Sequence, residues 1–426
     1  TMNKVLPGSY INFVSQARAM GSMGERGTVA LALELGWGEA EKIITLDNTE
    51  LQTEALELLG HNYIDDELKP LREASKRARE IKLYRLNGQG SKKAEVSIGG
   101  LKVTAKYPGT RGNDIKIAVQ KNIDNESEFE IITYLDAIEK DAQVVTAIEE
   151  LESNSFVDFA KTGDLGFEET AGTALTGGTD GTVTGESYAE FLDLIERESF
   201  NTIAYAGEDE VTKLLFDAFT KRLRDEDGYK ITCVLYDYAN ADFEGVISVK
   251  NQPELVYWYA GQTAGANFNK SLTNKIYDGE YEVNTKFKKR EFVEFINQGH
   301  VAFYQDGDDV RVLKDINTFA SFEPYKNRDF SDNRVMRVLD QIANDTAVIF
   351  NKFYLGKADN DETGRDLFKN ELVSHREDLQ QLRAIQNFEY DDIEVFKGKE
   401  KGDVGVNEAI EPTGAMEKLY HIVKVI

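Results

Sequence analysis

The sequence contains a single cysteine, Cys233, and this scarcity excludes several classes of protein. One cysteine cannot form a disulfide within the chain, so a secreted scaffold held by disulfides is excluded. It also leaves no Cys-x-x-Cys pair to hold a metal ion. Cys233 stands in the apolar run of residues 231–236. We therefore expect a buried thiol on a strand.

Long apolar runs are missing as well. No stretch approaches the ~20 consecutive apolar residues that span a bilayer, and the amino end has no basic segment followed by an apolar one, as a signal peptide would. We therefore expect a chain that is made and folded in the cytoplasm and is not inserted into a membrane.

Basic residues are in deficit, with 50 Lys and Arg against 76 Asp and Glu and a net charge of -26. A nucleic-acid-binding protein needs a basic face, because a negative field repels phosphate. Nucleic acid is therefore not expected as a partner. The acidity either keeps the chain soluble or has to be matched when copies of the chain lie close together, and the sequence leaves both open.

Motifs for catalysis and for cofactors are absent. There is no Gly-x-x-x-x-Gly-Lys-Ser/Thr phosphate loop and no Gly-x-Ser-x-Gly elbow, and Gly21, Gly24 and Gly27 do not have dinucleotide-binding spacing. We expect no cofactor, no metal and no enzyme activity. An α/β hydrolase-like enzyme stays the alternative, because catalytic triads assemble in space and not in sequence. No two of the four histidines fall at metal-ligand spacing: His61, His300, His375 and His421.

One acidic segment has part of a calcium-loop pattern. Asp359, Asp361 and Gly364 occupy its positions one, three and six, but position twelve is Asn370 and the expected glutamate comes one residue late, at Glu371. A solvated loop between two helices is therefore favoured over a calcium site.

The 426 residues and their 41% hydrophobic content predict two to four domains with buried cores. Period-two alternation between residues 94 and 181 predicts an inserted domain of half-buried antiparallel strands. Before and after it, strands and helices alternate, which predicts a largely parallel sheet covered by helices. Strands are expected at residues 28–33, 81–86, 95–100, 101–106, 114–119, 128–133, 199–205 and 230–236, with a hairpin of 299–304 and 310–313. Helices are expected at residues 48–59, 65–80, 187–196, 208–223, 254–268, 333–353 and 362–382.

Both chain ends carry a short strand-like segment. Residues 419–426 alternate two mostly apolar sets, and residues 9–15 form a similar strand-like segment before the glycines. An apolar strand must pair with a partner strand, because an open edge promotes aggregation. The partner is either this chain's own sheet or the sheet of a neighbouring copy.

Six motifs along nearly the whole length resemble the contractile tail sheath family of phages and phage-tail-like bacteriocins. They are Pro7-Gly-Ser-Tyr-Ile11, Tyr107-Pro-Gly-Thr-Arg-Gly-Asn-Asp114, Leu175-Thr-Gly-Gly-Thr-Asp-Gly181, Ala260-Gly-Gln-Thr-Ala-Gly-Ala266, Ser271-Leu-Thr-Asn274 and Ile296-Asn-Gln-Gly299.

The resemblance implies a multidomain fold of α/β and α+β type. It has a subtilisin-like α/β core without catalytic residues, an inserted β-sandwich domain, an α+β C-terminal domain and extended terminal strand arms. The expected segments are an N-terminal arm (1–22), the α/β core in two parts (23–92 and 183–325), the β-sandwich (93–182), the C-terminal domain (326–416) and the C-terminal arm (417–426).

The resemblance also implies a structural role. Hexameric rings of this chain would stack helically around a tail tube protein, contact baseplate and tail terminator proteins, and contract to drive the tube through a cell envelope. The particle would be a virion or a phage-tail-like particle, assembled in the bacterial cytoplasm. The N-terminal arm residues are Tyr10, Ile11, Asn12, Phe13, Val14 and Ser15. The C-terminal arm residues are Leu419, Tyr420, His421, Ile422, Val423, Lys424 and Val425. The candidate tube-facing residues, on the helix of residues 333–353, are Asn333, Arg334, Arg337, Asp340 and Asn344.

Overall fold

The computed structural model describes residues 26–424. These residues form two compact units. Residues 26–341 with 413–424 form the larger one, called the core unit below, and Ile342–Pro412 form the smaller C-terminal unit. None of the helices in residues 26–424 is both long and apolar enough to cross a membrane.

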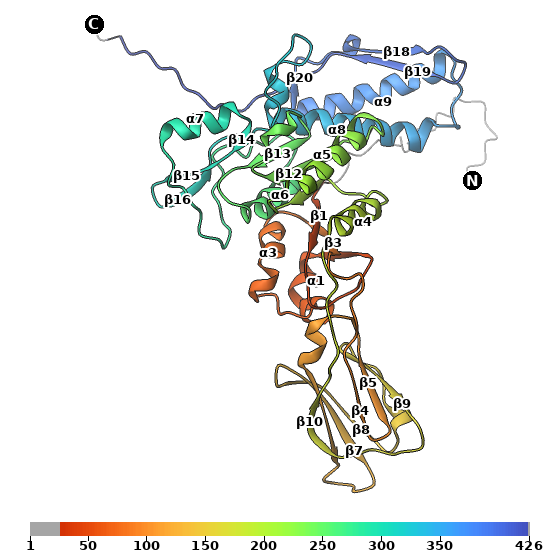
Figure 1. Ribbon diagram of the computed structural model, residues 1–426. Helices are drawn as coiled ribbons and strands as arrows, with labels where there is room; N and C mark the ends of the chain where they lie inside the picture. Colours follow the sequence, from red (N-terminus) through yellow and green to blue (C-terminus); the bar gives the residue numbers. More distant parts are fainter. Residues whose placement is uncertain (1–25, 425–426) are drawn as a thin grey trace, which may run out of the picture. The chain divides into compact units, whose positions relative to one another are not determined.

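A seven-stranded sheet lies at the centre of the core unit (Figure 1). Its strand order is β14-β13-β12-β11-β1-β3-β2, and every neighbouring pair is parallel except β2 with β3. The predicted parallel sheet is thus confirmed. The strands are β1 (Thr28–Leu33), β2 (Ile43–Asp47), β3 (Glu80–Arg85), β11 (Thr202–Tyr205), β12 (Thr232–Tyr236), β13 (Val246–Val249) and β14 (His300–Val301).

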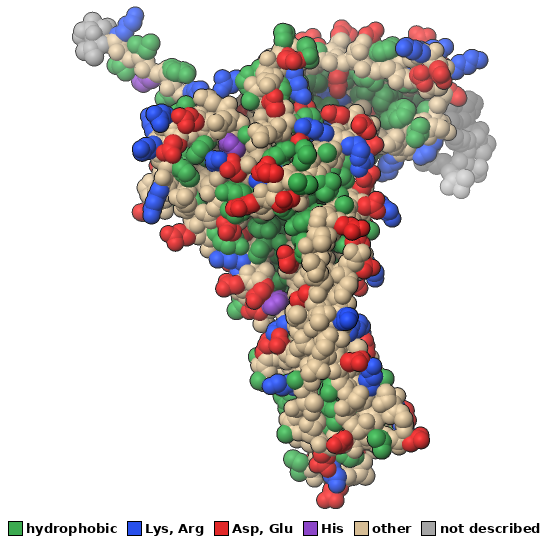
Figure 2. All heavy atoms as spheres, in the orientation of Figure 1, with side chains coloured by type: hydrophobic (Ala, Val, Ile, Leu, Met, Phe, Trp, Pro, Cys, Tyr) green, Lys and Arg blue, Asp and Glu red, His purple; other side chains and the backbone are tan. Residues whose placement is uncertain are grey.

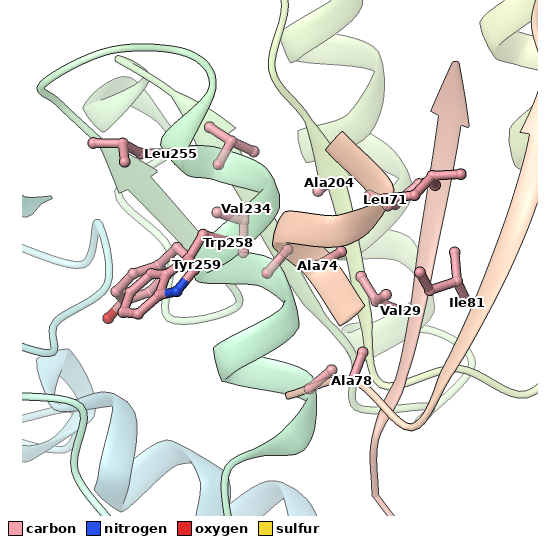
Figure 3. Packing of buried hydrophobic residues seen from close by; sticks show 14 of the residues in the cluster. Val29, Leu71, Ala74, Ala78, Ile81, Ala204, Val234, Leu255, Trp258 and Tyr259 are labelled. Atoms are coloured by element: carbon pink, nitrogen blue, oxygen red, sulfur yellow. The ribbon is translucent and has the colours of Figure 1, made fainter. Parts of the chain in front are cut away.

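Helices cover both faces of this sheet. On one face, buried residues of α3 and α6 pack with Val29 and Val234 (Figure 3). On the other face, Phe191 and Phe216 pack with the fully buried Cys233, so the predicted buried thiol is confirmed. The helices of the core unit are α1 (Asn48–Thr53), α2 (Ala55–Leu59), α3 (Lys69–Ser75), α4 (Gly185–Ile195), α5 (Glu210–Asp225), α6 (Leu255–Gly265) and α7 (Lys289–Asn297). Helix α8 (Asn333–Ile349) begins in this unit and ends in the C-terminal unit.

Two glycines allow α6 to lie directly against the α3 segment. A Cβ atom on Gly261 would stand 2.0 Å from the Ala74 carbonyl oxygen, and one on Gly265 would stand 1.9 Å from that of Arg77. Both glycines belong to the small-residue motif of residues 260–266. The motif therefore has a packing function, because backbones approach this closely only where no side chain intervenes.

We expect Gly261→Ala to lower the free energy of unfolding by about 1–3 kcal/mol, the usual cost of forcing extra volume into a packed core. Gly185→Ala is the matched control, because it has open space around its Cβ position and lies in α4. Urea denaturation should leave that control unchanged or slightly more stable. Equal stability of both variants would contradict the close packing of α3 and α6.

The predicted inserted domain consists of two antiparallel sheets, ordered β10-β6-β7-β8 and β4-β5-β9, which share one apolar core. The rings of Tyr107 and Phe156 lie 5.5 and 6.5 Å from Trp37, which belongs to the α/β part of the chain. The strands are β4 (Glu95–Ile98), β5 (Leu101–Ala105), β6 (Ile115–Lys121), β7 (Phe129–Leu135), β8 (Ile138–Val145), β9 (Val157–Lys161) and β10 (Thr170–Ala174).

The predicted hairpin around Asp306 and Gly307 is confirmed as β15 (Phe303–Asp306) with β16 (Asp309–Val312). The single strand expected at residues 299–304 is in fact divided in two. Its first residues form β14, which pairs in parallel with β13, and its last residues begin β15. The helix expected at residues 48–59 is broken at Glu54 into α1 and α2.

The C-terminal unit contains the end of α8, which passes into a π-helical turn (Phe350–Tyr354), and the long helix α9 (Glu362–Gln381). Two small antiparallel sheets complete it: β17 (Ile385–Gln386) with β20 (Glu411–Pro412), and β18 (Ile393–Lys397) with β19 (Val404–Glu408). The glycine- and charge-rich sequence after residue 390 favours a loop, but the structure shows that this segment contains the β18–β19 hairpin.

Candidate assembly surfaces

The C-terminal segment is anchored at its beginning and unpaired after that. Glu417 accepts a hydrogen bond from the Thr273 hydroxyl at 2.8 Å and lies 3.6 Å from the Lys314 ammonium. Thr413 accepts a hydrogen bond from Arg334 at 2.8 Å. In residues 413–424 no strand forms, and Figure 1 draws the segment as a coil.

Beyond Glu417 the apolar side chains of the arm are exposed. Leu419 is 89% exposed, Tyr420 86%, Ile422 85% and Val423 70%, and Figure 2 shows hydrophobic side chains along this segment. The described part of the chain therefore provides no partner strand for them. Val425 lies outside the described residues.

The N-terminal arm residues lie outside the described residues. Their role stays a prediction that rests on the sequence: Tyr10, Ile11, Asn12, Phe13, Val14 and Ser15.

Three of the five candidate tube-facing residues are buried inside the core unit. Asn333, Arg337 and Asp340 are 3%, 2% and 5% exposed. For these three, an internal role replaces the expected contact with a tube, because their polar atoms bond within the chain. Arg334 and Asn344 are half-buried, so a role in tube contact stays a prediction for them.

Asp315 is the centre of the internal network. Its carboxylate accepts hydrogen bonds from the Tyr259 hydroxyl at 2.7 Å, the Leu272 amide at 2.8 Å, the Asn333 amide at 2.9 Å and the Arg337 guanidinium at 2.5 Å. Burial alone would raise the pKa of Asp315, but Arg337 and these hydrogen bonds outweigh it and hold the pKa below its usual value. Helix α8 therefore starts on a fully ionised, hydrogen-bonded carboxylate.

A second buried ion pair fixes α8 one turn later. Arg224 on α5 donates two hydrogen bonds to the Asp340 carboxylate, at 2.8 and 2.7 Å, and a third to the Ile231 carbonyl oxygen at 2.6 Å. A fork-to-fork pair of this kind sets orientation as well as charge balance. The buried polar residues in the first half of α8 therefore hold residues 333–341 in place within the core unit.

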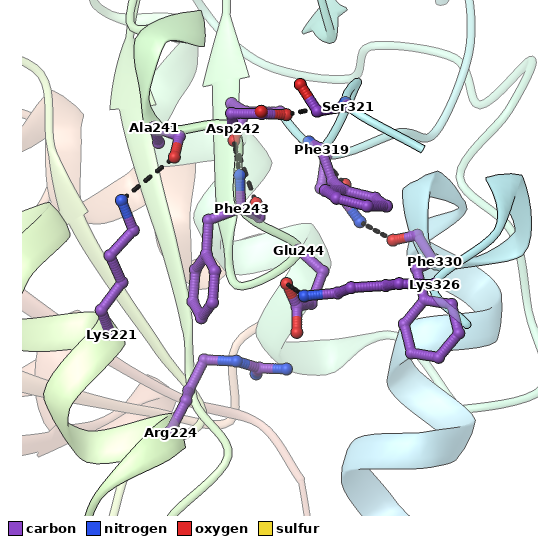
Figure 4. Close-up of polar contacts among 12 residues, drawn as sticks. Lys221, Arg224, Ala241, Asp242, Phe243, Glu244, Phe319, Ser321, Lys326 and Phe330 are labelled. Carbon is purple, nitrogen blue, oxygen red and sulfur yellow. Dashed lines mark hydrogen bonds and ion pairs between the residues drawn. The ribbon is translucent and has the colours of Figure 1, made fainter. Parts of the chain in front are cut away.

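The segment that leads into α8 is also fixed to the end of the sheet (Figure 4). The Lys326 ammonium lies 4.9 Å from the Phe319 ring centre and 2.6 Å from the Glu244 carboxylate. The Asp242 carboxylate accepts a hydrogen bond from the Ser321 amide at 3.0 Å. Burial would raise the pKa of Asp242, but hydrogen bonds from the Ser321 segment lower it.

Ser248, His300 and Asp237 form the constellation closest to a catalytic triad that we find in the described residues. The Ser248 hydroxyl lies 2.8 Å from His300 Nδ1, and Asp237 lies 3.8 Å from His300 Nε2. A triad has the reverse arrangement, with the serine on Nε2 and the acid on Nδ1. Ser248 is fully buried and accepts a hydrogen bond from the Tyr238 amide at 2.6 Å. The three residues therefore tie β13 to β14 and expose no nucleophile.

Burial and the charge of Lys250, which together outweigh the Asp237 carboxylate, lower the pKa of His300 to about 4. In the unfolded chain the imidazole titrates near 6.5, so protons bind the unfolded state first as the pH falls. Stability is therefore lost between about pH 6.5 and pH 4. We expect wild type to lose about 2 kcal/mol more unfolding free energy than His300→Asn between pH 7.5 and 5.0, measured with urea. Parallel pH profiles for the two proteins would contradict a neutral, buried His300.

In residues 26–424 no group of three or more His, Cys, Asp or Glu residues is placed to hold a metal ion. The calcium-like loop has another function, because the Asp361 carboxylate accepts a hydrogen bond from the Gly364 amide at 2.7 Å and caps α9.

The β18–β19 hairpin is a surface that the sequence analysis missed. Its strands pair over five residues each and have no further strand on either side within the described chain. The signal was present, because β-branched residues recur with period two on both sides of a glycine-containing turn: Ile393 and Val395 before it, and Val404 and Val406 after it.

Four family models match successive parts of the chain. They describe the tail sheath protein Gp18 domain III N-terminal region (residues 26–86), the phage tail sheath beta-sandwich domain (87–180), the phage tail sheath central domain (181–318) and the phage tail sheath C-terminal domain (325–426). The sheath tail protein of Desulfitobacterium hafniense is 40% identical, with a TM-score of 0.87 over 98% of this chain and 100% of that one. The chain belongs to the phage tail sheath protein family.

The chain is similar to further proteins along most of its length. The sheath tail protein of Listeria innocua is 33% identical, with a TM-score of 0.79 over 94% of this chain and 95% of that one. The XkdK protein of the phage-like element PBSX in Bacillus subtilis strain 168 is 34% identical over 98% of this chain and 97% of its own. The contracted helical sheath of the anti-feeding prophage, at 11% identity and a TM-score of 0.56, shares the fold. This tail sheath protein is thus a component of a phage tail or a phage-tail-like particle.

Proposed function

We propose that this sheath subunit polymerises by adding its C-terminal strand to a sheet of a neighbouring copy. The single observation that carries the proposal is the unpaired segment after Glu417, with four large apolar side chains that are at least 70% exposed. Leaving such a segment in water is unfavourable, and strand addition satisfies both its backbone and its side chains.

The β18–β19 hairpin of the neighbour is the proposed receiving sheet. It has free edges on both sides in the described chain, and each of its strands offers five residues in register. Residues 419–425 are long enough to pair along one edge. The N-terminal arm, Tyr10 to Ser15, would add to a neighbouring sheet in the same way.

The proposed assembly is a set of hexameric rings that stack helically around a tail tube protein, with baseplate and tail terminator proteins at the two ends. A short connecting segment joins each arm strand to its own subunit. The hydrogen bonds of the strand therefore persist while the folded domains of the subunits rotate and slide. The α/β core would have a subtilisin-like topology without a catalytic role. Assembly would take place in the bacterial cytoplasm.

Contraction in this proposal uses stored conformational energy. The extended sleeve is a metastable packing, trapped as subunits polymerise around the tube, and the contracted sleeve buries more surface between subunits. When one ring moves, the strands it shares with the next ring pull that ring along, so contraction spreads from the baseplate onward. This contraction drives the tube into a target envelope. A strict nucleotide requirement for contraction would contradict this mechanism.

The test of function is negative-stain microscopy of the purified chain, alone and with its tube protein. Hollow cylinders or stacked rings support a self-assembling sheath. Monomers under every condition, in a chain that circular dichroism shows to be folded, would contradict it.

A further inference from the structure

A cavity of about 350 Å³ lies at the carboxyl ends of β1 and β11 in the core unit. Strand β1 pairs with β3 on one side and β11 on the other, and α4 and α6 cover opposite faces of the sheet at this point. Crevices form at such positions in parallel sheets, because the covering helices diverge there. The volume is within the range of small-molecule and side-chain pockets.

Three tyrosines from three different elements line this cavity. Tyr188 comes from α4, Tyr205 from the end of β11 and Tyr257 from α6. The rings of Tyr188 and Tyr205 lie 5.2 Å apart, edge to face. Burial raises the pKa of both Tyr188 and Tyr257, so their hydroxyls stay neutral at physiological pH. The walls are therefore aromatic, with neutral polar tips.

Two carboxylates complete the lining, Glu34 after β1 and Glu254 before α6. No lysine, arginine or histidine is among the lining residues. Within residues 26–424, neither Glu34 nor Glu254 forms an ion pair. Aromatic faces with uncompensated carboxylates attract cations, through the ring quadrupole and through direct charge.

We propose that this cavity, called the tyrosine cavity below, binds the ammonium or guanidinium end of a side chain from a neighbouring sheath subunit. This inference rests on the proposed polymerisation but concerns a contact separate from the strand arms. A cation that enters the cavity offsets carboxylate charge that would otherwise repel an equally acidic neighbour. Cation binding in the cavity would thereby reduce the repulsion between neighbouring subunits, each of which has a net charge of -26.

The chain itself presents a matching basic group. Residues 286–290 hold four cations in five positions, the densest basic run in the sequence. Lys286, Lys288, Lys289 and Arg290 are all exposed. In the described residues only Arg290 of these four has a recorded ion pair, with Glu294 at 3.4 Å. We assign this basic run as the donor to the tyrosine cavity of the next copy.

A charge swap tests the contact in the full-length chain. Glu34→Lys with Glu254→Lys should raise the critical concentration for assembly at least tenfold, and Lys288→Glu with Lys289→Glu should do the same. A mixture of the two variants should assemble near the wild-type concentration. The control is a double variant at exposed sites of the β-sandwich, Glu126→Lys with Glu168→Lys. It changes the net charge by the same amount as the double Glu→Lys variant of the cavity, and it should assemble like wild type. If circular dichroism shows every variant to be folded but the mixture does not assemble near the wild-type concentration, the proposed contact between copies is overturned.

A small probe tests the cavity independently of assembly. n-Butylammonium, which carries the end group of a lysine side chain, should raise the melting temperature of the unassembled wild-type chain but not that of Glu34→Gln with Glu254→Gln. Neutral n-butanol should show no such difference. No effect of the cation would overturn the tyrosine cavity as a cation site. A cation effect combined with a failed charge swap would overturn the neighbouring subunit as the source. If wild type never assembles yet binds the probe, the proposed polymerisation fails and the cavity stands as a cation site.

Discussion

Removal of residues 419–426 is expected to abolish assembly into rings and cylinders while the monomer keeps its fold. The deletion begins after Glu417, so the contacts of that residue with Thr273 and Lys314 remain. It removes the four exposed apolar side chains of the arm. Burying each of these against a neighbour is worth about 1.5–3 kcal/mol, so the lost contact outweighs most other single contacts between subunits.

Sedimentation velocity and negative-stain microscopy measure this effect, and urea denaturation checks the fold. Met416→Ser is the matched control, because Met416 is fully exposed on the same segment but precedes the strand. It should assemble like wild type. Ile422→Asp should reproduce the deletion, since it places a charge within the added strand. Cylinders formed by the truncated chain would rule out the C-terminal arm as an essential connection.

Arg337→Met is expected to lower the free energy of unfolding by about 3–5 kcal/mol, because it leaves Asp315 buried without its counter-charge. Asp315 is 1% exposed, and Arg337 is the cation that pairs with it. Asp315→Asn with Arg337→Met should recover part of that loss, because no uncompensated charge then remains.

The matched control for this prediction is a surface pair. Asp193 on α4 and Arg197, two residues beyond the end of this helix, form an ion pair, and their side chains are 71% and 72% exposed. Arg197→Ala should change stability by less than about 0.5 kcal/mol, because water screens such a pair. Urea denaturation measures all four proteins. A loss below about 1 kcal/mol for Arg337→Met would contradict the view that α8 is locked to the core by buried charge.

The sequence predicted the parallel sheet well, because its strands are apolar runs with characteristic lengths between helices of clear periodicity. Strand β13 was missed because Val246–Val249 is only four residues long, although Gly245 and Pro253 on its flanks favour turns. Helix α7 was also missed, although Phe292, Phe295 and Ile296 recur at helical spacing, because the helix is only nine residues long and shows this spacing over little more than one turn.

The predicted tube contact of α8 rested on the family resemblance, which does not distinguish the exposed from the buried polar residues of this helix. Polar residues at helical spacing predict a solvent-facing or partner-facing surface. Here the two polar residues point into the core unit because each has a charged partner there. Arg337 pairs with Asp315, and Asp340 pairs with Arg224. Those partners lie 22 and 116 residues away in sequence. Only the fold reveals such pairs, whereas the apolar arm after Glu417 is visible in the sequence itself.

A helical reconstruction of the sheath assembled from the full-length chain tests strand addition by the C-terminal arm most directly. We expect residues 419–425 to appear as a strand hydrogen-bonded to an edge of the β18–β19 hairpin of a neighbouring copy. A reconstruction in which this segment pairs within its own subunit, or stays unpaired between well-ordered subunits, would contradict strand addition.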